Sequence, residues 1–149
     1  MKTSEWGPIT WVFIHVLVEK IIDNEFQSCK KAVIEIINSI ISILPCPFCR
    51  EWAINYTKSN PLSKCESKHQ LKLYVYKMHN AVNAKLNKPV EPEESLERYK
   101  QYKLTSIYVH YINFYTKGRI SRLDYGFNKI LAINNIKQLL VSNTNKFTN

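Results

Sequence analysis

Apolar residues recur at helical spacing in separate stretches of the chain. Between Ser28 and Pro45 they fall at steps of three and four residues, which places them on one face of a helix. That face consists of Val33, Ile36, Ile37, Ile40, Ile41 and Leu44. The stretch from Gly7–Pro8 to about Asp23 is apolar on most sides, so we expect a central helix that begins at this glycine–proline pair.

Helix signals continue in the middle of the chain. Proline suits the first turn of a helix, so a third helix is expected from Pro47 to about Lys58. Ser67 and Gln70 have the spacing of a capping box, which predicts the start of a fourth helix that ends before Pro89. The sequence thus predicts an all-α protein.

The pattern is less regular in the last third of the chain. A short charged helix is expected from Glu93 to Leu104. The segment Ile107–Tyr115 is β-branched and aromatic, so it fits either a strand or a helix, and Gly118 is expected to break it. Apolar spacing over Ile130–Leu140 indicates a last helix, and the tail from Ser142 is expected to fray.

Composition agrees with a helical globular protein. The chain has 149 residues, of which 45% are hydrophobic and 22% charged, which suits one domain, alone or with an appendage. It contains only 3 glycines. Hairpins and phosphate-binding loops need residues that tolerate positive φ, so this scarcity argues against a turn-rich β fold and a glycine-rich nucleotide loop.

The formal net charge is +9, and a basic surface can attract nucleic acid. The lysines are scattered singly, however, and the longest basic run is Lys30–Lys31. Nucleic-acid binding usually shows as a basic stripe, so no nucleic-acid partner is expected.

No membrane span is expected either. The uncharged apolar stretch Ile9–Val18 is half the length of the ~20 residues that a transmembrane helix needs. The amino terminus carries Glu5 and shows no signal-peptide pattern. We therefore expect a cytoplasmic protein.

The chain has 4 cysteines, at positions 29, 46, 49 and 65. Cys46 and Cys49 form a Cys-x-x-Cys pair with Pro47 between them, at an expected helix start. The unpaired N–H groups and the dipole of a helix amino terminus stabilise a thiolate, which improves it as a leaving group. The pair is therefore suited to accept electrons from a substrate dithiol.

Three interpretations of this pair compete. A glutaredoxin-like thiol reductase often carries Cys-Pro-Phe-Cys, but its fold needs a β-strand before the motif, where this chain has helical spacing. A zinc-stapled interaction module would use Cys46, Cys49, Cys65 and His69, whose spacing suits a tetrahedral site, although small zinc modules are usually rich in glycine and turns. The third interpretation is a dithiol linked to a flavin in a helical bundle.

Two further segments favour the flavin. The first is Trp6–Gly7–Pro8–Ile9–Thr10–Trp11 with His15 one turn later, and the second runs from His79 to Pro89 as HNAVNAKLNKP. With Leu44–Pro45–Cys46–Pro47–Phe48–Cys49 between them, the chain closely resembles the Erv/ALR family of FAD-linked sulfhydryl oxidases, from Trp6 to about Leu104. Taken singly, each His, Asn or Trp would fit core packing or a polar surface; the order and spacing of all three motifs carry the resemblance.

The resemblance implies a four-helix bundle that holds FAD, with a short fifth helix beside it. It implies an FAD-binding oxidase domain over residues 1–104 and an extension of unknown role over 105–149, which we expect to be helical. Tyr99 or Tyr102 would stand where the family has an aromatic residue. The positions that would contact FAD are Trp6, Gly7, Pro8, Trp11, His15, His79, Asn80, Val82, Asn83, Leu86 and Lys88.

The resemblance also implies a reaction. Cys46 would form a mixed disulfide with a substrate dithiol, and Cys49, next to the flavin, would pass the electrons on to O2 with formation of H2O2. The chain lacks a second, shuttle Cys-x-x-Cys, and Cys65 has no partner at the family's Cys-x16-Cys spacing. It therefore looks most like the short oxidases of large cytoplasmic DNA viruses, whose partner is a separate thioredoxin-like or small dithiol protein, in an infected cell or a virion.

Two questions follow from the family comparison. Cys29 and Cys65 would be free, paired with each other or bonded to another molecule. Helix one carries more apolar residues than one bundle face can bury, so we expect a homodimer through helices one and two. The competing explanation is that the segment after Thr105 folds over that face and replaces the partner.

Overall fold

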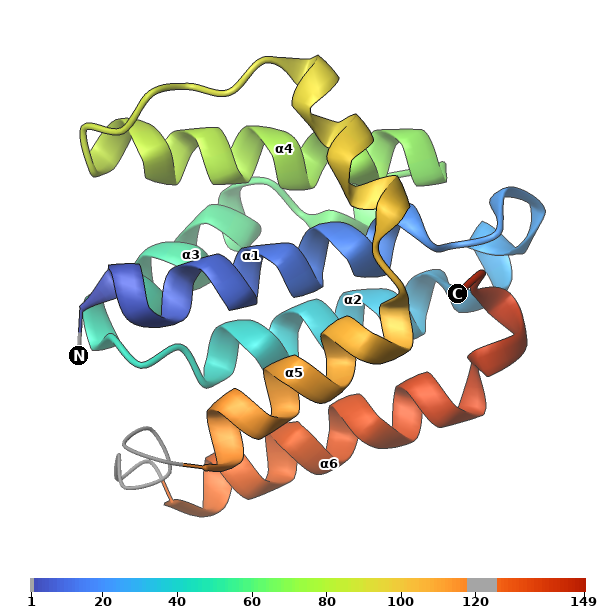
Figure 1. The fold of residues 1–149 in the computed structure, drawn as a ribbon. Coiled ribbons are helices and arrows are strands. Elements are labelled where there is room, and N and C mark those ends of the chain that lie inside the picture. The colour runs from blue at the N-terminus through green and yellow to red at the C-terminus, as the bar shows by residue number, and fades with distance from the viewer. Residues whose placement is uncertain (1, 118–125) are drawn as a thin grey trace.

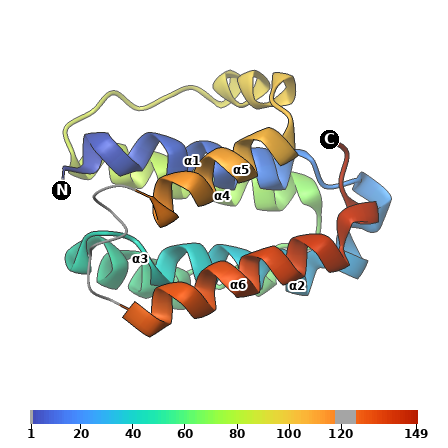
Figure 2. The ribbon, with the colours of Figure 1, turned by 60° about the horizontal axis from the view of Figure 1, so that its bottom comes forward.

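The computed structural model describes residues 2–117 and 126–149, and six α-helices form two layers (Figures 1 and 2). Helices α1, α4 and α5 form one layer and α2, α3 and α6 the other. The helices are α1 (Thr3–Glu19), α2 (Phe26–Ser42), α3 (Pro47–Ser59), α4 (Lys68–Lys85), α5 (Leu104–Thr116) and α6 (Gly126–Ser142). Short 3-10 helices are η1 (Asp23–Glu25), η2 (Leu62–Lys64), η3 (Glu93–Gln101) and η5 (Thr144–Lys146). The all-α prediction is confirmed.

The core lies between the two layers. The predicted apolar face is confirmed, since its five residues on α2 are buried, as is Leu44 just after the helix. Helix α1 is central, and Phe13, Val16 and Leu17 are fully buried. It packs against α4 and η3 on one side and against α5 on the other, which explains why it is apolar nearly all round.

Both ends of α1 differ from the prediction. The helix begins at Thr3 rather than at Gly7–Pro8, because the Glu5 carboxylate accepts a hydrogen bond of 2.8 Å from the Lys2 N–H and caps an earlier start. It ends at Glu19 rather than near Asp23. There the chain turns to form an isolated antiparallel bridge between Ile21 and Phe147, which a helix could not make.

The start of α4 follows the prediction. The Ser67 hydroxyl accepts the Gln70 N–H at 3.1 Å. The Gln70 side chain accepts the N–H of Glu66 at 2.8 Å instead of that of Ser67, so the reciprocal bond of the box is shifted by one residue.

Within residues 105–117 and 126–149, the segment after residue 104 is mostly helical and packs on the same core. The undecided stretch Ile107–Tyr115 is part of α5, whose Tyr111 ring lies 4.6 Å from Phe13 of α1. Helix α6 packs against α2, and Asn135 donates to the Ser39 hydroxyl at 3.0 Å. The expected break at Gly118 lies outside the described residues.

The tail was expected to fray from Ser142, and this prediction is wrong. Residues after α6 form η5 and then pair with the loop that follows α1. The Ile22 N–H donates to Lys146 and the Thr148 N–H to Lys20, at 2.9 and 2.7 Å. None of the helices in the described ranges combines the length and apolar character needed to span a membrane.

Candidate active site

Cys46 and Cys49 are joined as a disulfide at the amino end of α3. Cys46 is the N-cap residue, and its sulfur accepts the Cys49 N–H at 3.2 Å. Pro47 occupies the first helical turn, where its missing N–H costs no hydrogen bond. The helix start therefore holds the Cys46 sulfur next to a backbone donor, which stabilises a thiolate there when the bond is broken.

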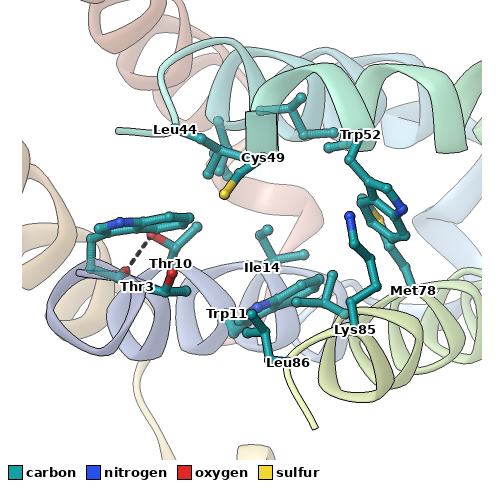
Figure 3. Close-up of a pocket in the computed structure, with 15 residues that line it drawn as sticks. Thr3, Thr10, Trp11, Ile14, Leu44, Cys49, Trp52, Met78, Lys85 and Leu86 are labelled. Carbon is teal, nitrogen blue, oxygen red and sulfur yellow. Dashed lines mark hydrogen bonds between the residues drawn. The ribbon is translucent and has the colours of Figure 1, made fainter. Parts of the chain in front are cut away.

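The two sulfurs face different surroundings. Cys49 lines an internal cavity, and its sulfur points from α3 toward Ile14 (Figure 3). Cys46 does not line that cavity, although both cysteines are half-buried. Phe48, between the cysteines, exposes 82% of its side chain. The disulfide thus has one sulfur on the cavity wall and the other outside the cavity, next to an exposed aromatic ring.

The first cavity is apolar and lies between α1, α2, α3 and α4 (Figure 3). Three tryptophans, Trp6, Trp11 and Trp52, contribute to its wall. The Lys85 ammonium lies 5.0 Å from the centre of the Trp52 ring. An apolar, aromatic-lined space of this kind suits an apolar ring better than a charged ligand.

Two features of the first turns of α1, one at this cavity and one beside it, are not explained by the protein's own packing. The indole N–H of Trp6 is buried and has no hydrogen-bond partner among the described residues. Gly7 is buried, yet a Cβ atom there would meet only the Thr3 side chain, at an ordinary 3.5 Å. A buried donor without an acceptor costs about 1–3 kcal/mol, so the N–H is suited to receive one from a ligand.

The second cavity is polar. It lies between α4, η3 and the loop that joins them, and one wall is His15 of α1. Asn80 holds the loop by exchanging two hydrogen bonds of 3.0 Å with the backbone of Glu91. Arg98 of η3 forms an ion pair with the Glu91 carboxylate at 3.2 Å.

The end of α4 brings Lys88 to this second cavity. Asn87 has a positive φ of 55°, a conformation that asparagine tolerates. The Lys88 N–H then returns to the carbonyl of Asn83 at 2.8 Å, and the Asn87 N–H bonds to Ala84 at 3.2 Å. This is a Schellman motif, and it turns the chain back over α4.

Aromatic rings separate the two cavities. Trp11 lines the first and His79 the second, and their rings stack at 4.1 Å with 6° between the planes. His15 stacks on Tyr99 at 4.3 Å. A hydrogen bond of 2.9 Å joins His15 Nε2 and His79 Nδ1. Four rings from α1, α4 and η3 are thus fixed against one another.

Both histidines of this partition are held neutral. Burial lowers the pKa of His15 to about 3, and the neighbouring His79 and Arg98 add to the shift. Burial also lowers the pKa of His79 to about 4. Only one of the two bonded nitrogens can carry the proton, so at neutral pH one ring donates this hydrogen bond and the other accepts it.

The structure brings nine of the eleven positions assigned to FAD to the two cavities. Trp6, Trp11, Val82 and Leu86 line the first, and His15, His79, Asn80, Asn83 and Lys88 line the second. Gly7 and Pro8 line neither. Of the two candidate tyrosines, Tyr99 lines the second cavity.

Sequence reasoning missed several lining residues. They include Ile14, Trp52, Met78 and Lys85 in the first cavity and Tyr76 and Arg98 in the second. Met78 and Lys85 are separated from Val82 by four and three residues on α4, so helical spacing from a motif residue could have found them. Trp52 likewise follows Cys49 by three residues on α3.

The remaining cysteines and the alternative interpretations are also clarified. Cys29 and Cys65 are buried and free, and burial raises the pKa of both thiols.

The disulfide occupies two of the four sulfur and nitrogen ligands of the zinc alternative, and no three potential metal ligands converge within residues 2–117 and 126–149. A helix, α2, precedes the Cys-x-x-Cys motif, so the strand that a glutaredoxin needs is replaced by helix.

Comparison with known proteins gives a consistent result. A protein of invertebrate iridescent virus 3, named as an FAD-linked sulfhydryl oxidase, is 33% identical over 85 residues, which cover 56% of this chain and 57% of the viral protein. The FAD-linked sulfhydryl oxidase of African swine fever virus is 28% identical over 121 residues, 81% of this chain and 88% of the relative. The enzyme of that name from Arabidopsis thaliana is 29% identical over 94 residues, 63% of this chain and 49% of the plant protein.

The matched region therefore spans little more than half of the iridescent virus protein. No solved structure matches the chain significantly. The sequence profile of the Erv1/Alr family matches residues 8–103, which include the disulfide and nearly all residues of both cavities. The chain belongs to the Erv1/Alr family.

Proposed function

We propose that this chain is an FAD-dependent sulfhydryl oxidase that forms disulfides in protein dithiols and passes the electrons to O2. The observation that carries the proposal is the Cys46–Cys49 disulfide, which has one cysteine on the wall of an aromatic cavity and the other outside it, next to an exposed aromatic ring. Such an arrangement lets a substrate reach one sulfur while an internal electron acceptor reaches the other. Family membership and the names of the relatives support the same function.

The chemistry of the two cavities fits FAD. The apolar cavity beside Cys49 suits the flavin ring, and the unpartnered indole N–H of Trp6 offers a donor to a ring oxygen or nitrogen. The polar cavity offers Lys88 and Arg98 to a pyrophosphate and asparagine side chains to a ribose or adenine. We propose the nine lining positions as FAD contacts, with Gly7 and Pro8 shaping the turn that carries Trp6.

The protein's part in the reaction begins at the Cys46 sulfur. A thiolate of the substrate attacks Cys46 Sγ, which breaks the Cys46–Cys49 bond and releases Cys49 as a thiolate. The Cys49 N–H at the start of α3, which bonds to Cys46 Sγ, stabilises negative charge on Cys46 when that sulfur in turn becomes the leaving group. The second substrate thiolate then attacks the substrate sulfur of the mixed disulfide, which completes the substrate disulfide and releases Cys46.

The cysteine pair now holds two electrons. Bound FAD supplies the two-electron acceptor chemistry that restores the disulfide and reduces O2 to H2O2. The protein positions Cys49 on the cavity wall and keeps bulk water away with Trp6, Trp11 and Trp52.

The proposed partner is a thioredoxin-like or small dithiol protein. The exposed Phe48 and the half-buried Cys46 support a macromolecular substrate, because they present an apolar side chain next to the sulfur that is attacked. The viral relatives support a cytoplasmic or virion setting.

The proposal is tested by spectroscopy and turnover of the purified protein. We expect a yellow protein with a flavin absorption band, which consumes O2 and forms H2O2 with dithiothreitol. Cys46→Ser and Cys49→Ser should lose at least about 99% of this turnover and keep their FAD, because the cysteines relay electrons while other residues hold the cofactor.

The matched controls are Cys29→Ser and Cys65→Ser, whose thiols are buried away from the disulfide. They should retain most of the activity. A colourless protein, or a Cys49→Ser variant with most of its turnover, would overturn the proposed function. Bound zinc together with loss of activity in Cys65→Ser would favour the metal-binding alternative.

A further inference from the structure

A residue outside the family-matched region reaches the wall of the apolar cavity. Tyr115 lies on α5, beyond residue 103 where the match ends, and it is fully buried. Its hydroxyl lies 2.8 Å from the Thr10 hydroxyl of α1. Thr10 lines the cavity, between Trp6 and Trp11 on the same helix.

The direction of these hydrogen bonds follows from the number of protons. The Thr10 hydroxyl donates its only proton to the carbonyl of Trp6 at 2.8 Å. Tyr115 must therefore donate to Thr10. A relay of two bonds runs from α5 through Thr10 to the backbone of Trp6, and it is buried along its whole length.

The turn of α1 that carries Trp6 needs support from outside the helix. Pro8 has no N–H, so the carbonyl of Ser4 lacks its usual intrahelical donor. Gly7 adds conformational freedom that weakens a helix. The Thr10 hydroxyl supplies an additional bond to this weakened turn, and Tyr115 fixes the rotamer of Thr10 that makes it.

We propose that Tyr115 is a positioning residue for FAD: it holds Thr10 and, through it, the turn of α1 that presents Trp6 to the cofactor cavity. The inference rests on the proposed function. A wall that is already ordered before the ligand binds loses less entropy on binding, so the relay should tighten the complex without touching the ligand. It gives α5 a role in cofactor binding.

The test is the rate of FAD release from the holoprotein. Tyr115→Phe removes the donor and keeps the ring that packs on Tyr111. Release into buffer with excess unlabelled apo-flavoprotein as a trap, followed by flavin fluorescence, should become about fivefold faster, the effect of losing one hydrogen bond of ordinary strength. The rate of hydrogen exchange should also rise at the backbone amides of residues 9–12, which follow Pro8 in this turn. The rise should be seen in both the holoprotein and the apoprotein.

Two further variants isolate the relay. Tyr108→Phe removes a hydroxyl from the same helix that makes no bond to Thr10, and it should release FAD at the wild-type rate. Thr10→Val breaks the relay at its centre, whereas Thr10→Ser keeps the hydroxyl. We expect Thr10→Val to accelerate FAD release and Thr10→Ser to release FAD at about the wild-type rate. In the double variant, Tyr115→Phe should add little to the effect of Thr10→Val.

The outcomes are distinct. Unchanged release and exchange in Tyr115→Phe, or additive effects of Tyr115→Phe and Thr10→Val, would overturn the inference even if the unfolding temperature fell. If Tyr115→Phe does not fold, Thr10→Val against Thr10→Ser makes the same comparison. A wild-type protein that carries no FAD would overturn the proposed function and this inference together.

Discussion

Phe48 is an aromatic side chain that the fold leaves in water. It exposes 82% of its surface, and it is the only aromatic residue among the large exposed hydrophobics of the described chain. Burying a phenylalanine side chain is worth about 1.5–3 kcal/mol, so a partner that covers Phe48 gains affinity at the sulfur that is attacked. This favourable energy is available to a protein substrate and not to a small dithiol.

We therefore expect Phe48→Ser to change substrate preference. The ratio of kcat/KM for a protein dithiol to kcat/KM for dithiothreitol should fall by about tenfold, mainly through the KM of the protein substrate. Val109→Ser, which removes an exposed apolar side chain of α5, is the matched control and should leave the ratio unchanged. An unchanged ratio in Phe48→Ser would mean that the ring does not contact the substrate.

The neutral histidines predict a pH dependence of stability. In the folded protein the pKa of His15 is about 3 and that of His79 about 4, below the ordinary 6.5 of an unfolded chain. Between about pH 4 and 6.5 the unfolded state therefore binds more protons than the folded state. The contribution of the two histidines to the free energy of unfolding is fully present above pH 6.5 and falls as the pH is lowered toward 4.

Urea denaturation at several pH values measures this slope. In His15→Gln the free energy of unfolding should fall less between pH 6.5 and 4 than in the wild type, because glutamine cannot take up a proton on unfolding. His69→Gln, at the exposed start of α4, is the matched control. Equal slopes in the wild type and His15→Gln would contradict the burial that holds this ring neutral.

At the residue level, the sequence predicts the parts of the site that lie in recognisable motifs. The Cys-x-x-Cys pair and the His79–Pro89 segment lead to most of the polar cavity and to the disulfide. Ile40 and Ile41 could not be assigned in this way, because an apolar residue on a helix looks the same whether it faces a core or a cavity. Only the packing of the four helices distinguishes the two.

Within α1, a substitution of Gly7 should change the stability of the protein and the binding of its cofactor in opposite directions. A glycine inside a helix costs about 0.5–1 kcal/mol relative to alanine, and a Cβ atom fits at this position. Gly7→Ala should therefore stabilise the apoprotein by this amount and at the same time weaken FAD binding, because the added methyl group takes up space beside the turn that carries Trp6.

Thermal unfolding of the apoprotein and the FAD release rate measure the two effects. Ala53→Gly, inside α3, is the converse control, since it should destabilise the apoprotein. A Gly7→Ala variant that is more stable and holds FAD as tightly as the wild type would show that the glycine has no role toward the cofactor.

Among the elements, α2 and α4 are predicted well because each carries a complete signal of its own. The apolar face of α2 is buried as expected, and Ser67 caps α4. The end of α1 is predicted poorly because its cause is distant: Ile21 leaves the helix to pair with Phe147. Helix α5 is β-branched and aromatic, and it is helical because its buried tyrosines pack on α1.

On the scale of the whole molecule, α5 packs on α1 and α6 packs on α2. These are the two helices through which the sequence predicts a homodimer. Phe13 and Leu17 of α1 are fully buried within the single chain. The covering of both helices supports the competing explanation, in which the carboxyl-terminal segment takes the place of a partner. We therefore expect the full chain to be monomeric.

Light scattering on two lengths of the protein tests this expectation. A truncation that ends at Lys103 uncovers both faces and should dimerise or aggregate, because each exposed core side chain costs about 1.5–3 kcal/mol. A truncation that removes only residues 143–149 retains α5 and α6 and controls for loss of the chain end. A dimer of the full chain would restore the family-type arrangement.

The packing of α5 on α1 also constrains the order in which the protein can fold during translation. Helix α1 is synthesised first, but its cover, α5, begins only at Leu104. Ribosomes add roughly 5–20 residues per second, so α1 spends seconds outside the exit tunnel before α5 can reach it. During that interval Phe13 and Leu17 are open to chaperones and to neighbouring nascent chains, and the hydrogen bond that Thr10 on the cavity wall receives cannot form until Tyr115 has been made.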